Sequence, residues 1–265
     1  MADRRMTEET MDQTIQPAAA EPAAAEPAAR PVVVAVDGPA GSGKSSVSRE
    51  AARRLGYELL DTGAAYRAFA WHALANDVDL GSGDPDAIAR AAVLLIPSFQ
   101  DRYAIALHPD ERWVRVGEDD VTDAIRDTAI SEQVSAIARV PQVRAALTDR
   151  FRRFLRESTA PGIIAEGRDI TTVVAPDADA RILLTADESV RIARRAAEKS
   201  EDDAAEVARS VSVRDAKDRA VVDFLEPAPG VELLDSTDLD FEQTVIRMLE
   251  LIRAASRSGA AGTTN

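Results

Sequence analysis

The sequence contains no cysteine and only two histidines among its 265 residues. Without thiols the chain has neither a disulfide framework nor a thiolate metal site, which agrees with a reducing cytoplasm. Two histidines are too few for a typical histidine-based metal centre. No apolar run reaches the length of a membrane-spanning helix, and the N-terminus has no apolar signal core. We therefore expect a cytoplasmic protein with no membrane partner.

Basic residues are also scarce, with 32 lysines and arginines against 46 aspartates and glutamates and a net charge of −14. An acidic chain is a poor candidate for wrapping nucleic acid, so we expect no nucleic-acid partner.

The two ends of the chain lack the apolar residues that a core requires. Residues 1–30 are polar and then rich in alanine, glutamate and proline, and the recurring prolines interrupt helix. Residues 257–265 are small and polar. We expect a disordered arm at the N-terminus and a flexible tail at the C-terminus.

Between these ends, helical patterns separate short apolar segments. The alternation is typical of buried parallel strands in a doubly wound α/β fold. After the first strand, Val47, Ala51 and Leu55 repeat at helical spacing up to a stop at Gly56. Near the end of the chain a second helical stripe is formed by Phe241, Val245, Met248, Leu249 and Ile252. The five predicted strands are Val32–Asp37, Tyr57–Asp61, Gly162–Glu166, Arg181–Thr185 and Val231–Asp235.

The interval 76–157 breaks the alternation. It holds strand-like segments at Arg102–Leu107 and Arg112–Val116, around a turn at His108, and then two helical patterns, the second with Pro141 at its start. We interpret it as an inserted α+β domain. The predicted core then comprises 31–75, 158–187 and 219–256.

A phosphate-binding loop of the form G-x-x-x-x-G-K-[ST] follows the first strand and precedes a helix. In such a loop, backbone N–H groups and the helix N-terminus hold the phosphates of a nucleotide. Lys44 can reach the β- and γ-phosphates, and the Ser45 hydroxyl can ligate Mg²⁺. The predicted ATP-binding residues here are Gly38, Pro39, Ala40, Gly41, Ser42, Gly43, Lys44, Ser45 and Ser46.

Two further apolar strands end in charged residues. Asp61 and Arg67 follow the second strand, and Arg168 and Asp169 follow the third. Ligands of open α/β sheets bind at the carboxyl ends of strands, so these groups are expected near the phosphate loop. Arginine suits a phosphate and aspartate a sugar hydroxyl or another arginine. The structural alternatives are a helix cap at Thr62 and a plain Arg–Asp pair.

A basic helix face and an acidic stretch beyond it suggest a lid over 188–218 that closes on polyphosphate. Its first arginines, Arg191, Arg194 and Arg195, share one helix face, although such a face is often merely solvated. Arg214 and Arg219 are further basic residues beyond the acidic stretch.

Taken together, these motifs resemble those of the bacterial cytidylate kinases, in the nucleoside monophosphate kinase group of P-loop kinases. The resemblance covers about residues 32–252. It is carried by the segments Val34 to Ser45, Leu60 to Arg67, Gly117 to Thr122, Glu166 to Val174 and Leu234 to Thr237.

The resemblance implies a P-loop NTPase-type core, a monophosphate-binding insert and a short helical lid. It implies transfer of the ATP γ-phosphoryl group to CMP or dCMP, with Mg²⁺ held at Ser45, ATP oxygens and waters. We expect a monomer. The implied substrate-binding residues are Asp61, Thr62, Arg67, Ser135, Arg144, Arg168, Asp169, Arg214 and Arg219.

Within this set the resemblance gives distinct roles. Thr62 and Asp169 match ribose contacts, and Ser135 and Arg144 match positions that read cytosine. Lys44, Arg67, Arg168 and Arg214 are the implied catalytic residues, and Arg191, Arg194 and Arg195 match donor-phosphate contacts.

One position departs from the family pattern. The family usually has a further arginine seven residues beyond the one that matches Arg214; here that place holds Val221, while Arg219 stands two residues earlier. Either a two-residue deletion keeps Arg219 in that role, or the contact is lost.

Two other functions remain open on the sequence alone. The first is a kinase for another acceptor, such as UMP, AMP or a small alcohol, because the loop and lid would look the same. The second is a P-loop switch or motor, although no guanine-reading N-K-x-D string is present. Asp37 and Asp61 are further candidates for holding magnesium-bound waters or orienting Lys44.

Overall fold

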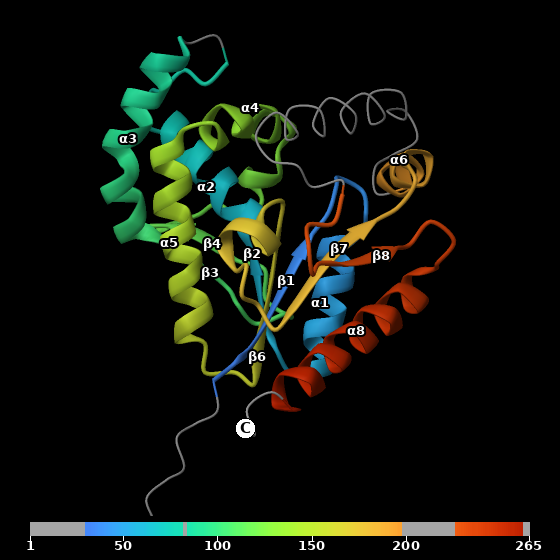
Figure 1. Ribbon diagram of the computed structural model, residues 1–265. Coiled ribbons are helices and arrows are strands. Elements are labelled where there is room, and N and C mark those ends of the chain that lie inside the picture. The colour runs from blue at the N-terminus through green and yellow to red at the C-terminus, as the bar shows by residue number, and fades with distance from the viewer. Residues whose placement is uncertain (1–29, 82–83, 198–225, 262–265) are drawn as a thin grey trace, which may run out of the picture. The chain divides into compact units, whose positions relative to one another are not determined.

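The structure, a computed structural model, describes residues 30–81, 84–197 and 226–261. The described part from Pro31 onward is built around a five-stranded parallel sheet with strand order β2-β6-β1-β7-β8 (Figure 1). All five predicted strands are confirmed, each to within one residue at either end. They are β1 (Val32–Asp37), β2 (Glu58–Asp61), β6 (Gly162–Gly167), β7 (Ala180–Thr185) and β8 (Glu232–Asp235).

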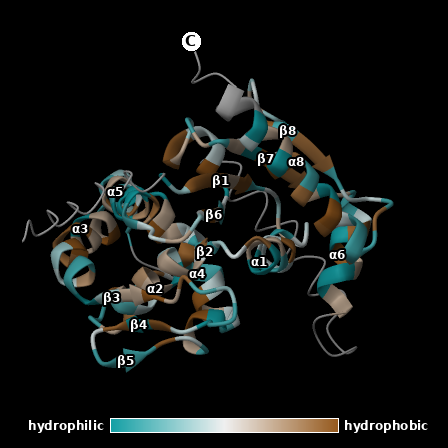
Figure 2. Ribbon diagram, turned by 90° about the horizontal axis from the view of Figure 1, so that it is seen from below, coloured by the Kyte–Doolittle hydropathy of each residue, from teal (hydrophilic) through white to brown (hydrophobic). Residues whose placement is uncertain are grey.

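Helices cover both faces of the sheet, so the doubly wound α/β prediction is confirmed. Val34 and Val36 of β1 pack in one cluster with two of the helices, α1 and α8, while Ala35 belongs to the cluster on the other face with α2. β1 is coloured hydrophobic along most of its length in Figure 2, as a strand buried on both faces should be. The flanking helices are α1 (Lys44–Leu55), α2 (Thr62–Leu74) and α8 (Phe241–Ala261).

The predicted stripes of these helices are confirmed with one exception. Val47 and Ala51 are buried in α1, which ends at Gly56 with φ of 67°. In α8 the side chains of Val245, Met248, Leu249 and Ile252 are buried. Phe241 is 52% exposed, so its assignment to that stripe was wrong. It is the first residue of α8 and lies outside the cluster that the others form.

The insert between α2 and β6 contains more helices and strands than predicted. The two strand-like segments pair antiparallel as β3 and β4, and Pro141 opens a helix, as expected. Neither α3 nor β5 was predicted, because Pro97 interrupts the helical pattern of α3 and β5 has only two residues, both acidic. The elements are α3 (Pro85–Arg102), β3 (Tyr103–Ile105), β4 (Val114–Val116), β5 (Asp119–Asp120), η1 (Ala124–Arg126), α4 (Thr128–Ala138) and α5 (Pro141–Glu157).

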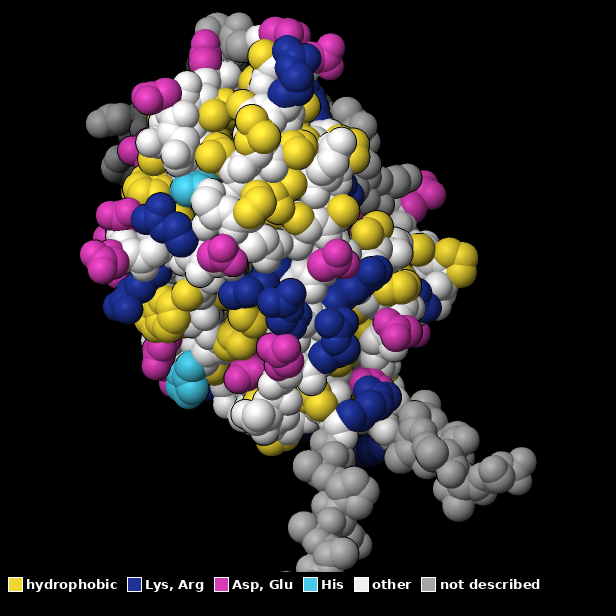
Figure 3. All heavy atoms as spheres, turned by 90° about the vertical axis from the view of Figure 1, so that its left-hand side faces the viewer, with side chains coloured by type: hydrophobic (Ala, Val, Ile, Leu, Met, Phe, Trp, Pro, Cys, Tyr) yellow, Lys and Arg dark blue, Asp and Glu magenta, His cyan; other side chains and the backbone are white. Residues whose placement is uncertain are grey.

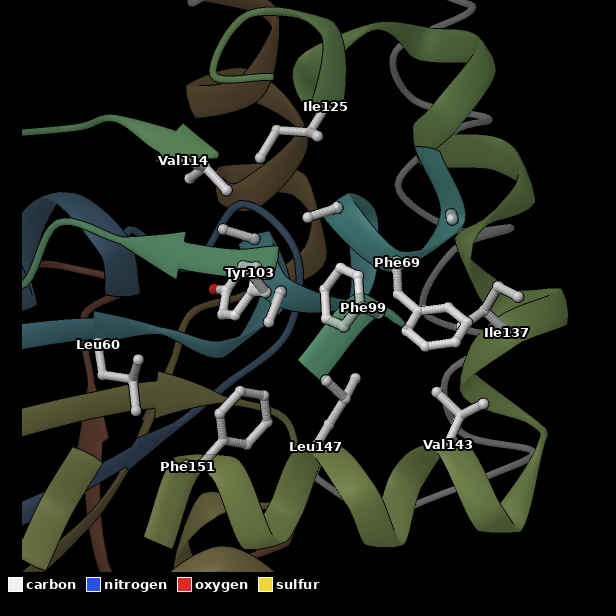
Figure 4. Close-up of a cluster of buried hydrophobic side chains, with 14 of the residues drawn as sticks. Leu60, Phe69, Phe99, Tyr103, Val114, Ile125, Ile137, Val143, Leu147 and Phe151 are labelled. Atoms are coloured by element: carbon white, nitrogen blue, oxygen red, sulfur yellow. The ribbon is translucent and has the colours of Figure 1, made fainter. Parts of the chain in front are cut away.

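One hydrophobic cluster continues from the sheet into the insert. It joins Leu60 of β2 to Phe69 of α2, Phe99 of α3 and Phe151 of α5 (Figure 4). The Phe99 ring lies 4.8 Å from that of Phe69 and 4.9 Å from that of Tyr103, measured between centroids. The insert is thus anchored to α2 by aromatic packing. The division of the chain into separate core and inserted domains stays a prediction.

Replacing Phe99 with alanine is expected to lower the free energy of unfolding by about 3–5 kcal/mol, because the side chain is fully buried and leaves a cavity. Urea unfolding with an unchanged m-value measures this loss. Leu94→Ala, on the same helix but 80% exposed, is the matched control and should change stability by less than about 0.5 kcal/mol. A Phe99→Ala loss below about 1 kcal/mol would contradict the packing shown in Figure 4.

Two more elements, η2 (Ile170–Val174) and α6 (Glu188–Ala197), follow β6 and β7. Several predicted parts lie outside the described residues: the arm up to residue 29, the lid beyond α6 with Arg214, the start of the last core segment with Arg219, and the end of the tail. Within the residues described, no helix is both long and apolar enough to cross a membrane. On the face shown in Figure 3, which α3 and α5 form, basic side chains gather across the middle.

Candidate active site

The phosphate loop joins the carboxyl end of β1 to the first turn of α1, as predicted. Gly43 is the N-cap of α1 with φ of 85°, and it has no side chain to satisfy the first backbone N–H groups of that helix. A Cβ added to Gly38 would lie 2.2 Å from the carbonyl oxygen of Leu184, so only glycine allows this close approach to β7. The loop therefore leaves backbone donors available to an anion.

The hydroxyls of the loop suit phosphate and magnesium. The Ser42 side chain is buried, and its Oγ has no hydrogen-bond partner among the described residues. Ser45 Oγ donates to Glu166 Oε2 at 2.8 Å. In the described part of the chain, no group of three acidic or histidine side chains could hold a metal. Mg²⁺ in phosphoryl-transfer sites needs few protein ligands, so one hydroxyl beside a carboxylate fits it.

Glu166 is the functional candidate that the sequence analysis missed. It lies on β6 and is 2% exposed. Burial, and then the nearby charge of Asp61, raise the pKa of Glu166 to about 7, while Lys44, Ser45 and Arg67 act in the opposite direction. Because Ser45, Lys44 and Asp61 all act on its carboxyl group, Glu166 lies between the phosphate loop and the Asp61 site. In the sequence, its signal was an acidic residue at the end of an apolar strand, directly before Gly167 and Arg168.

Asp61, Thr62 and Arg67 come together at the start of α2, as expected. Asp61 is the N-cap of the helix, and its Oδ1 accepts from the Ala64 N–H at 2.8 Å. The structural alternative made Thr62 the cap, but its hydroxyl instead donates to the Glu166 carbonyl at 2.7 Å. The position explains the difference, because Thr62 already belongs to the helix. Arg67 reaches Asp61 at 3.3 Å, and its buried Nε has no partner among the described residues.

Asp37 has a structural role that its position in the sequence did not indicate. Its Oδ1 accepts from the Ile170 N–H at 2.8 Å. Its Oδ2 accepts from the N–H of Thr171 at 2.8 Å and from the hydroxyl of the same residue at 2.6 Å. Burial raises the pKa of Asp37, and these hydrogen bonds oppose the shift. Asp37 thus fixes the turn that carries Arg168 and Asp169.

Arg168 and Asp169 connect the phosphate loop to the insert. One guanidinium nitrogen of Arg168 donates to the Gly38 carbonyl. The Asp169 carboxylate pairs with Arg144 of α5 at 2.6 Å, and burial raises the pKa of Asp169 against the effect of that arginine. Ser135 lies on α4, half-buried. The predicted substrate residues that the structure describes therefore come from the sheet edge, α2, α4 and α5.

Arg191 and Arg194 of α6 donate hydrogen bonds to residues outside that helix, mainly to backbone carbonyls. Arg191 is buried and donates to the carbonyls of Ala40 at 2.8 Å and of Ala186 at 3.1 Å. Arg194 donates to Ser236, through both its hydroxyl and its carbonyl, and to the Leu239 carbonyl. α6 is thereby tied to the phosphate loop and to the turn after β8. Donor-phosphate contacts of Arg191, Arg194 and Arg195 stay a prediction.

Comparison with known proteins identifies the family. A family model described as Cytidylate kinase matches residues 34–254. A cytidylate kinase of Cutibacterium acnes is 46% identical over 230 residues, covering 86% of this chain and 98% of the relative. Cytidylate kinases of Rhodococcus opacus and Rhodococcus jostii are 43% and 42% identical, each over 86% of this chain and 96% and 97% of the relative.

The matched residues cover nearly the whole described part of the chain. They include the phosphate loop and the charged residues at the carboxyl ends of β2 and β6. The protein is accordingly a phosphotransferase that acts on nucleotides, and ATP is the co-substrate that its family implies. The chain belongs to the cytidylate kinase family.

Proposed function

We propose that the protein transfers the γ-phosphoryl group of Mg-ATP to the phosphate of CMP or dCMP, giving CDP or dCDP and ADP, within pyrimidine nucleotide metabolism. One observation carries the proposal: the phosphate loop and the arginine-bearing turn of residues 167–171 meet at the carboxyl edge of the sheet. Arg168 donates to Gly38, and Glu166 accepts from Ser45. Donor and acceptor phosphates bound at these two segments would be neighbours.

The chemistry needs positions and positive charge more than a nucleophile. The acceptor phosphate is already an oxyanion at neutral pH, so no serine or histidine must be activated. Two anions must instead be held close together and in line. In the proposal, Lys44 holds the donor phosphates, and Arg67 and Arg168 hold the acceptor and stabilise the charge of the transition state.

The donor site would hold magnesium, which when bound would neutralise part of the negative charge of the donor phosphates. Ser45 is the proposed ligand from the protein. Glu166, which accepts from the Ser45 hydroxyl at 2.8 Å, would orient that hydroxyl.

The insert is proposed to read the base. Arg144 and Asp169 form an ion pair with 23% and 9% of their side chains exposed, so both are sheltered yet accessible. Asp169, the implied ribose contact, thereby positions the guanidinium of Arg144, whose N–H groups can donate to the carbonyl of a base. Ser135 of α4 is the proposed second contact to the base. A monomeric state and a cytoplasmic location stay predictions.

The test is ADP formation from Mg-ATP with CMP, dCMP, UMP, AMP and GMP in parallel, beside a control without acceptor. We expect strong turnover with CMP and dCMP alone. Preference for another monophosphate would overturn the roles of Ser135 and Arg144 in base recognition. Turnover that needs no acceptor would overturn the kinase proposal and favour a switch or motor.

A further inference from the structure

A pocket beside the acceptor residues is lined by four arginines. It lies where α1, the end of β2 and the start of α2 meet the loop before β4 and η1. Among the described lining residues only Asp61 and Glu111 are acidic, so this part of the lining is positive in a chain of net charge −14. The four arginines are Arg49, Arg67, Arg112 and Arg126.

Acidic partners compensate these charges poorly. Among the residues that the structure describes, Arg112 makes no ion pair, and Arg126 has only Asp123 at 3.6 Å. Both are exposed. Arg67 approaches Asp61 no closer than 3.3 Å, and its buried Nε lacks a partner within the described chain. The pocket therefore holds guanidinium donors that remain available to an anion.

The fold holds these like charges together. Arg49 Nη1 donates to the carbonyls of Pro109 and Glu111, which ties the loop before β4 to α1. Burial lowers the pKa of Arg49, and the charge of Arg112 lowers it further. Guanidinium groups gathered in this way repel one another, and a bound dianion would relieve that repulsion.

The pocket adjoins the groups of the reaction. Arg49 stands one helical turn after Ser45, and its pKa responds to the charges of Glu166 and Asp61. Arg67, a proposed acceptor clamp, belongs to the lining itself. An anion in the pocket would therefore lie on the acceptor side of the phosphate loop.

We propose that Arg49, Arg112 and Arg126 extend the acceptor site and, with Arg67, attract and hold the phosphate dianion of the incoming nucleoside monophosphate. This inference rests on the proposed function. In an acidic protein the acceptor is repelled at long range, and a local arginine cluster reverses the field where the phosphate must bind. The cluster recognises the phosphate alone, so it should contribute to affinity without discriminating between bases.

The test compares the binding of CMP, cytidine and inorganic phosphate by calorimetry in wild-type protein and in Arg112→Gln, Arg126→Gln and the double variant. Each exposed arginine can be removed without opening a cavity. We expect CMP to bind about tenfold more weakly to Arg126→Gln, the effect of one charge-assisted hydrogen bond, and more weakly still to the double variant. Cytidine, which has no phosphate, should bind equally to all four proteins. Added salt should weaken CMP binding more in wild type than in the double variant.

Arg115→Gln is the matched control. Arg115 is exposed and follows Val114, which lines the pocket, so it points to the opposite face of β4. CMP binding to Arg115→Gln should equal that of wild type. An equal loss in Arg115→Gln, or a parallel loss of cytidine binding, would overturn the inference.

Three outcomes separate this inference from the proposed function. Wild-type protein that neither binds nor phosphorylates any monophosphate overturns both. An active wild type beside a double variant that binds CMP unchanged overturns the inference alone. In the third outcome, inorganic phosphate binds through these arginines but is not displaced by CMP. The pocket would then hold a separate anion, and the assignment of the pocket to the acceptor phosphate would be overturned.

Discussion

Lys44→Ala is expected to lower kcat with CMP by about a thousandfold, while the protein stays folded. The positive charge of Lys44 lies close enough to lower the pKa of both Asp37 and Glu166. Its charge therefore lies near the carboxyl ends of β1 and β6, where the donor phosphates are proposed to bind. No other lysine occurs in the predicted ATP-binding residues to replace it.

Steady-state kinetics with Mg-ATP and CMP measure the effect, and thermal unfolding shows whether the fold is kept. Arg90→Ala, which removes a charge from the exposed side of α3, is the control and should leave kcat unchanged. If Lys44→Ala keeps more than about a tenth of wild-type kcat, the lysine does not stabilise the transition state as proposed.

Arg168→Ala is expected to lower kcat/KM for CMP by about a thousandfold, with little change in KM for ATP. The arginine sits on the turn that Asp37 anchors through its hydrogen bonds to Ile170 and Thr171. Its position is thus fixed before any substrate binds. Arg168→Lys should recover only part of the activity, because an ammonium cannot form the two parallel hydrogen bonds of a guanidinium.

The control for this variant is Arg181→Ala. Arg181 lies at the amino end of β7, whereas Arg168 follows the carboxyl end of β6, and it donates to the Pro229 carbonyl. Near-normal turnover in Arg168→Ala, or an equal loss in Arg181→Ala, would remove Arg168 from the proposed mechanism.

Much of the fold could be predicted because its signals are local. Strands buried on both faces must be apolar along their length, and this pattern predicted both β1 and β6. The phosphate loop is equally local, since a strand, glycines, one lysine and one serine lie within a short stretch of chain. α3 escaped prediction because Pro97 breaks its pattern, and tertiary packing of residues such as Phe99 overrides that local signal.

The amino-acid sequence by itself determined the strands, the phosphate loop and which strand ends carry charge. The tertiary structure alone decided which charges meet. The sheet places β6 between β1 and β2, and so brings Glu166 to Ser45 across 121 positions of the chain. It likewise gives Asp37 its partners near Thr171 and gathers the arginine pocket. Periodicity reports which side of an element is buried, whereas a contact between distant residues depends on strand order, which no local pattern encodes.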